Sequence, residues 1–86
     1  MPTISGSLEA LASSIDKGAD LARAAEAIKS TRELTKDKDL PVLKELDAEL
    51  SVWQSKLSVI LNAPEGKKGM AKHARFWAEK LKAIHV

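Results

Sequence analysis

The most regular pattern of apolar residues lies between Leu43 and Leu61. Its members are spaced alternately three and four residues apart: Leu43, Leu46, Leu50, Trp53, Leu57 and Ile60. On a helix this spacing gathers them into an arc about 100° wide, the width of a core-facing stripe. Asp39, an acid able to cap, and Pro41, suited to a first turn, precede the segment, and residues 62–64 (Asn-Ala-Pro) end it. The pattern predicts one long helix.

The second half of this predicted helix is poor in charge. Between Leu50 and Pro64 only Lys56 is charged, and Val52 and Val59 lie on the back of the helix, away from the stripe. Because such a surface gains little from contact with water, we expect it to be covered on more than one side. The segment is therefore predicted to be the central helix of a small bundle, or half of a dimer interface.

The N-terminal third carries a stripe that changes direction. Ser7 could cap a helix beginning at Leu8, and the apolar face rotates by about a quarter turn after Gly18. Either Gly18 separates two helices, with Asp20 capping the second, or one long helix tolerates the glycine. We favour the continuous, slightly kinked helix, because residues 22–27 are strongly helix-forming. Residues 30–33 form a capping box, so a break there is a further alternative.

The last predicted helix follows a turn at residues 62–66 and runs from Lys67 or Lys68 to Ile84. Its core stripe is Met70, Ala74, Trp77, Leu81 and Ile84. No stretch alternates with a period of two for long enough to predict a strand. The expected fold is all-α, a three- or four-helix bundle, with residues 1–86 forming a single domain and residues 1–6 a flexible N-terminus.

The composition of the chain excludes several kinds of reactive or metal-binding site, although it says less about the fold. The chain has no cysteine, which excludes disulfides and thiolate chemistry. We find neither a signal-peptide pattern nor an apolar run of membrane-spanning length, so the expected location is the cytoplasm and no membrane partner is expected. His73 and His85 are twelve residues apart, too far to share a metal on one helix, and no GxSxG motif is present. We expect no catalytic residue, no metal and no cofactor.

Positive charge is concentrated at the end of the chain. Residues 1–62 contain eight Lys/Arg and ten Asp/Glu, a net charge of −2, whereas residues 63–86 contain six and two, a net charge of +4. The candidates for contact with phosphate or with an acidic partner are Lys67, Lys68, Lys72, Arg75 and Lys82. The alternative is an ordinary solvated face, because Glu79 lies within it and no aromatic residue is placed to stack on a base.

The lysine pair also belongs to a GxxG motif at residues 66–69. A phosphate-clamping GxxG loop of the KH type needs an adjoining sheet, and this chain has no predicted strand. We therefore expect residues 66–69 to form a flexible loop.

Three apolar residues lie off the predicted stripes and are the partner-binding candidates: Val52, Val59 and Phe76. Either the N-terminal helices cover them, or they form an exposed patch that marks a partner site. The expected function is that of a non-catalytic protein-binding module, an adaptor, inhibitor or regulatory subunit that acts through helix faces. A homodimer is one form it could take. The alternative is a nucleic-acid-binding protein that uses the basic C-terminal helix.

Overall fold

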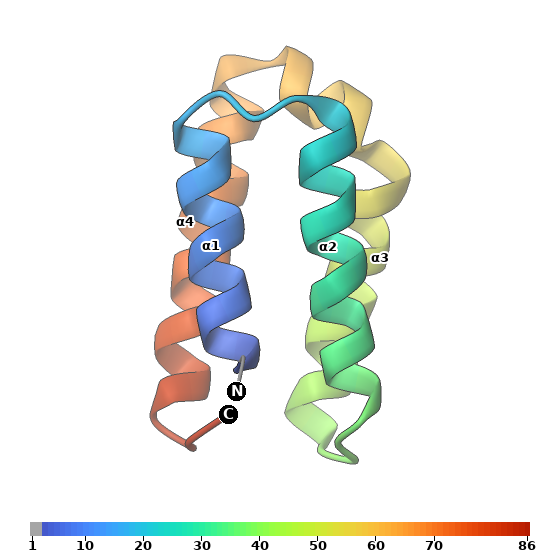
Figure 1. The fold of residues 1–86 in the computed structure, drawn as a ribbon, viewed down its shortest axis with the longest axis vertical. Helices are drawn as coiled ribbons and strands as arrows, with labels where there is room; N and C mark the ends of the chain where they lie inside the picture. Colours follow the sequence, from blue (N-terminus) through green and yellow to red (C-terminus); the bar gives the residue numbers. More distant parts are fainter. Residues whose placement is uncertain (1–2) are drawn as a thin grey trace.

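A computed structural model describes residues 3–86, which form four helices that run alternately up and down (Figure 1). These are α1 (Ile4–Asp16), α2 (Leu21–Lys36), α3 (Pro41–Asn62) and α4 (Pro64–Lys82). The bundle measures 33 × 20 × 20 Å, and the ends of the described chain lie side by side at one end of it. The prediction of an all-α bundle is confirmed, with four helices rather than three.

The four helices enclose the core as a square. α1 packs against α2 and α4, and α3 packs against the same two neighbours, whereas the core separates the diagonal pairs. The prediction of a central α3 is therefore wrong. Each helix has one apolar stripe, and four such stripes can be buried together only when every helix stands at the rim of a shared core.

The predicted stripes supply most of this core. The side chains that are fully buried or nearly so include Leu8, Leu11, Ile28, Leu43, Leu46, Leu50, Leu57, Met70, Ala74 and Leu81. Trp53 and Trp77, both predicted to be core residues, are each 7% exposed. The periodicity also predicts a core position for Ile84, but α4 ends at Lys82 and Ile84 is exposed. Ile84 lies beyond the end of α4, so the helical periodicity no longer directs its side chain toward the core.

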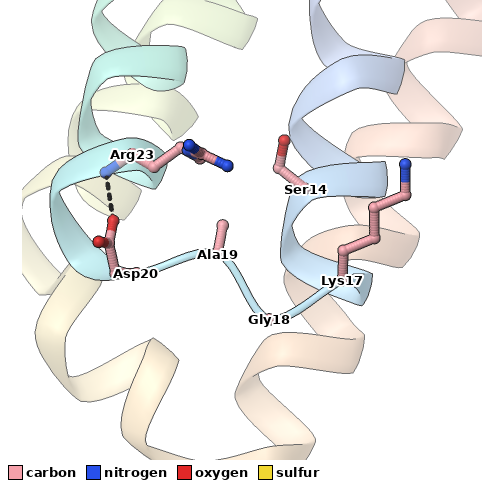
Figure 2. A pocket seen from close by; sticks show the side chains of 6 residues that line it. All are labelled: Ser14, Lys17, Gly18, Ala19, Asp20 and Arg23. Carbon is pink, nitrogen blue, oxygen red and sulfur yellow. Dashed lines mark hydrogen bonds between the residues drawn. The ribbon is translucent and has the colours of Figure 1, made fainter.

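The N-terminal helix is interrupted at Gly18, so the prediction of one continuous helix is wrong. Gly18 has φ +84°, a left-handed conformation that glycine adopts readily and that ends α1. Asp20 then caps α2 by accepting a hydrogen bond of 2.9 Å from the amide of Arg23 (Figure 2). The strong helix propensity of residues 22–27 is satisfied by starting a new helix there.

The first helix starts four residues earlier than predicted. Thr3 rather than Ser7 is the cap, accepting from the amide of Gly6 at 2.9 Å, and Ile4 is buried. Residues 4–6 of the expected flexible segment are thus helical, and residues 1 and 2 lie outside the described residues. Ser7 instead contacts the buried Thr31 of α2, with 2.5 Å between their hydroxyl oxygens. α2 continues without interruption from Leu21 to Lys36, so the helix does not break at residue 30.

The remaining boundaries also differ from the prediction. Asp39 does not cap α3, because Leu40 occupies the cap position and Asp39 pairs loosely with Lys44. Residues 66–69 form early turns of α4 rather than a loop. A Cβ at Gly66 would lie 2.7 Å from the carbonyl oxygen of Ile60, so only glycine allows α4 to start this close to α3.

Candidate functional site

A carboxylate joins α3 to α4 on the side of the bundle that both helices form. Glu49 accepts a hydrogen bond of 2.6 Å from the indole Nε1 of Trp77. Its other carboxylate oxygen lies 2.9 Å from Nδ1 of His73. The acceptor of both hydrogen bonds is a carboxylate, and hydrogen bonds to an ionised group are stronger than those between neutral groups. They establish which sides of the two helices meet.

A shallow hollow of about 280 Å³ continues along the same seam. Its lining is mainly apolar and comes from both helices: Glu49, Trp53, Ile60, Gly66, Gly69, Met70 and His73. Two of the four α4 residues are glycines, which have no side chain to raise a wall. Parts of Trp53, Ile60 and Met70 therefore line an open groove between α3 and α4.

The three partner-binding candidates are all exposed. Val52 is 52%, Val59 69% and Phe76 60% exposed. α3 is covered on two flanks, by α2 and by α4, but none of the described helices covers its back, where Val52 and Val59 lie, because α1 stands diagonally across the core. The structure leaves these side chains open to solvent.

Helix geometry places Val52 and Val59 on the outer side of the seam. Relative to Glu49, which faces α4, Val52 is rotated about 60° in one direction and the buried core residue Leu50 about 100° in the opposite direction. A kink at Lys56, whose backbone angles are not helical, follows. Beyond the kink Val59 stands two residues after the buried Leu57, as Val52 stands two residues after Leu50. The two valines therefore form a rim along the solvent side of the groove.

The same argument applies to α4. Trp77 faces Glu49, Ala78 is rotated toward the core, and Phe76 is rotated about 100° the other way. The ring of Phe76 meets that of Trp77 edge-on, with centroids 6.4 Å apart and planes at 77°. Phe76 thus forms the opposite rim. We call Val52, Val59, Phe76 and the groove between them the outer face.

The structure divides the predicted basic face into two parts. Arg75 forms an ion pair with Asp16, and Lys82 forms one with Glu9, so both join α4 to α1. The hydrogen bond with Glu9 raises the pKa of Lys82 above its ordinary value of 10.5. These two cations therefore already have carboxylate partners.

The other three predicted cations are Lys67, Lys68 and Lys72. Lys67 is half-buried, whereas Lys68 and Lys72 are exposed. Within residues 3–86, none of the three lies at ion-pair distance from a carboxylate. Free positive charge on α4 is thus smaller than the sequence indicates.

Sequence reasoning missed two residues of this region. The ammonium of Lys80 lies 5.1 Å from the centre of the Trp77 ring, a cation–π contact. Its spacing of three residues from Trp77 was a usable signal, because residues three apart are neighbours on a helix. Glu49 gave no such signal, since both of its partners belong to another helix.

A second, polar hollow of about 460 Å³ lies at the connection between α1 and α2. Figure 2 shows the guanidinium of Arg23 extending toward α1, where Ser14 and Lys17 line the opposite side. Asp20, beside them, caps α2. Along residues 3–86 we find no group of three or more His, Asp or Glu side chains arranged to hold a metal ion.

Comparison with known proteins does not assign the chain to a family: no family model, curated protein or solved structure gave a match. Among the helices of the described region, none combines the length and apolar character needed to cross a bilayer.

Proposed function

We propose that this protein is a non-catalytic binding module that recognises another protein through the outer face. The observation that carries the proposal is the exposure of Val52, Val59 and Phe76 beside an apolar groove. Burying one such side chain completely stabilises a complex by about 1.5–3 kcal/mol. A partner that covered the three exposed parts would gain several kcal/mol from them alone.

The core supports this proposal, because it is complete without the three side chains. Each helix already buries its own stripe, and the described buried polar side-chain atoms all have hydrogen-bond partners. A polar residue at position 52 or 59 would serve the fold of the monomer equally well, and Phe76 contacts the monomer through its edge-on packing with Trp77. Exposed apolar residues that lie together beside an apolar groove are typical of a surface that a partner covers.

The ion pairs of Arg75 and Lys82 weigh against nucleic acid as the partner. Phosphate binding depends on cations that can exchange counterions for phosphate, and these two are held by Asp16 and Glu9. Protein recognition therefore has the stronger support. We propose an adaptor, inhibitor or regulatory subunit in the cytoplasm as the setting for such a module, with a homodimer as a special case.

The test compares two triple variants in affinity capture from the source cells. In the face variant, serine replaces Val52, Val59 and Phe76. In the control, serine replaces three apolar residues that are exposed elsewhere, Leu21, Leu40 and Ile84. We expect the wild type and the control to capture the same proteins and the face variant to lose them.

Thermal unfolding of all three proteins would show that each is folded. Capture of the same proteins by the face variant would contradict the proposal. Sedimentation of the wild type over a range of concentrations would show whether the captured partner is a second copy of the chain.

A further inference from the structure

Four residues of α4 form an exposed stripe on the outer face: Glu65, Gly69, Phe76 and Lys80. At about 100° of rotation per residue, the other three lie within about 40° of Phe76. Neither Glu65 nor Lys80 lies at ion-pair distance from an opposite charge within residues 3–86. The stripe therefore has an acidic end and a basic end, and both charges are free.

The order of these residues is symmetric about the middle of α4. Gly69 and Phe76 lie at equal distances before and after the peptide bond that joins Lys72 to His73, and so do Glu65 and Lys80. When two identical helices pair in opposite directions about a twofold axis, a residue before the axis meets the residue at the same distance after it. A second copy of α4 would therefore place ammonium against carboxylate and the phenyl ring against the glycine.

Gly69 leaves room for that ring. A Cβ at this position would meet no atom within 4 Å among the described residues. Glycine is less favourable within a helix than any residue except proline, and Gly66, unlike Gly69, is explained by its approach to Ile60. The ring of Phe76 from a second copy would cover the gap and would itself lose the exposure that it has in the monomer.

The neighbouring helix α3 fits the same axis. It runs opposite to α4 (Figure 1), and the hydrogen bonds of Glu49 with His73 and Trp77 place that residue level with residues 73–77. Val52, three residues further along α3, therefore lies level with the middle of the α4 stripe. The axis would bring Val52 against Val52 of the second copy.

The charges of α3 on this face follow the same rule. Glu45 and Glu49 lie before Val52, and Lys56 lies after it. Because the axis reverses one copy relative to the other, Lys56 would lie level with residues 45–49 of the second copy. Each helix of the outer face thus carries opposite charges on the two sides of one axis.

Two further charges lie at the margin of the face. Glu79 is 3.6 Å from Lys82, on the side away from the groove. Lys72 is rotated about 40° beyond Phe76, also away from the groove, and its long side chain can extend into water. These two residues do not stand between the copies.

The balance of charge favours a second copy over a uniformly charged partner. Across the outer face three acids accompany three lysines: Glu45, Glu49, Glu65, Lys56, Lys72 and Lys80. A strongly acidic or basic partner would meet like charges on such a surface, whereas the surface itself, turned about the axis, presents the opposite charge at each end.

The available area is also sufficient. The bundle is 33 Å long and 20 Å wide. One complete side therefore approaches the roughly 800 Å² that each partner contributes to a stable interface.

Resting on the proposed function, we infer that the partner of the outer face is a second copy of this chain. The two copies are related by a twofold axis beside Val52 and the middle of α4, with the helices of one copy running opposite to those of the other. Phe76 of each copy covers Gly69 of the other, and Lys80 pairs with Glu65.

The first measurement is the mass of the wild type in sedimentation equilibrium, from micromolar to millimolar concentration. We expect a reversible dimer that the serine variant of Val52, Val59 and Phe76 does not form. Gly69→Ala is expected to weaken the dimer several-fold, because the methyl group occupies the space of the ring. In dilute solution, where the monomer predominates, the same change is expected to raise the melting temperature.

Charge exchange tests the pairing of Glu65 with Lys80. By symmetry each single change, Glu65→Lys or Lys80→Glu, reverses two contacts, and we expect it to weaken the homodimer about tenfold at low salt. An equal mixture of the two variants restores association, because every contact in the mixed dimer again joins opposite charges. Glu26→Lys and Lys29→Glu, exposed changes on α2, are the matched controls and leave association unchanged.

Cysteine cross-linking tests the position of the axis, since the chain has no cysteine of its own. A disulfide requires Cα atoms within about 7 Å of each other. Val52→Cys is expected to form a disulfide-linked dimer under mild oxidation. Val59→Cys is the control and is expected not to, because its two copies would lie about 20 Å apart along the helices.

The outcomes separate this inference from the proposed function. A wild type that remains monomeric, or a dimer that the serine variant retains, would overturn the second copy as partner, whereas the capture experiment alone decides whether the outer face binds another protein. A dimer lost in the serine variant but not restored by the mixture, or cross-linked equally at positions 52 and 59, would overturn the antiparallel arrangement inferred here.

Discussion

Two glycines of this chain show how much a single residue depends on its backbone. Gly18 has a positive φ, and a Cβ there would have no atom within 4 Å, so only its conformation requires glycine. Gly69 has equally open space but lies within the regular helix α4. Alanine is disfavoured in the left-handed region and favoured in a helix. The same substitution should therefore have opposite effects at the two positions.

Gly18→Ala is expected to destabilise the protein by about 1 kcal/mol, because the new side chain must adopt a left-handed backbone. Gly69→Ala is expected to stabilise it by up to about 1 kcal/mol. Urea unfolding monitored by tryptophan fluorescence measures both changes. Stabilisation by Gly18→Ala would mean that the α1–α2 turn does not require a positive φ.

At the scale of elements, polar contacts determine how neighbouring helices align. Ser7 and Thr31 align α1 with α2, Glu49 aligns α3 with α4, and the pair of Glu9 with Lys82 aligns α1 with α4. Apolar stripes are non-directional, so they bring helices together without specifying how far each slides. Hydrogen bonds and ion pairs are short-range and supply that alignment.

The Lys82 pair gives a pH-dependent prediction. Since Glu9 raises the pKa of Lys82 above 10.5 in the folded state, the pair contributes stability that is complete below pH 10.5. The contribution is lost as pH rises above 10.5 through the folded pKa. Wild type is therefore expected to be more stable than Lys82→Met at neutral pH and to lose this difference at higher pH.

Chemical unfolding of both proteins at a series of pH values measures the difference. Lys36→Met, an exposed change on α2, is the matched control. A difference between wild type and Lys82→Met that did not change above pH 10.5 would contradict the assignment.

At the scale of the whole molecule, the square arrangement of helices decides which surfaces remain free. Arg75 and Lys82 of α4 form ion pairs with acids of α1. The outer side of α3 and α4, in contrast, has no neighbour among the described helices. The molecule therefore presents an apolar groove and only part of the basic face predicted from sequence. The proposal of a protein partner rests on this arrangement.

The protein is expected not to bind labelled mixed-sequence DNA or RNA tightly, even at about 50 mM salt, where phosphate contacts are strongest. Fluorescence anisotropy at about 50 and 200 mM salt measures this. Tight binding at low salt that collapsed at high salt, and that Lys68→Glu and Lys72→Glu abolished, would instead establish the basic face of α4 as the functional surface.

The sequence by itself determined the helical class, the extent of α3 without its kink at Lys56, and most of the core. Apolar periodicity is a local property, so the stripe from Leu43 to Leu57 can be recognised without knowledge of its neighbours. The sequence also contained the signals for a turn at Gly18 and a cap at Asp20. Strong local helix propensity pointed the other way, and the packing of α1 beside α2 decided between them.

Only the tertiary structure decided which surfaces are free. Whether Val52, Val59 and Phe76 are covered depends on which helices are neighbours, and that is a property of the whole bundle. The neutralisation of Arg75 and Lys82 likewise requires acids on α1 that are remote in sequence. Periodicity determines the face that a helix buries, whereas the faces that remain for a partner are determined only when all four helices have packed.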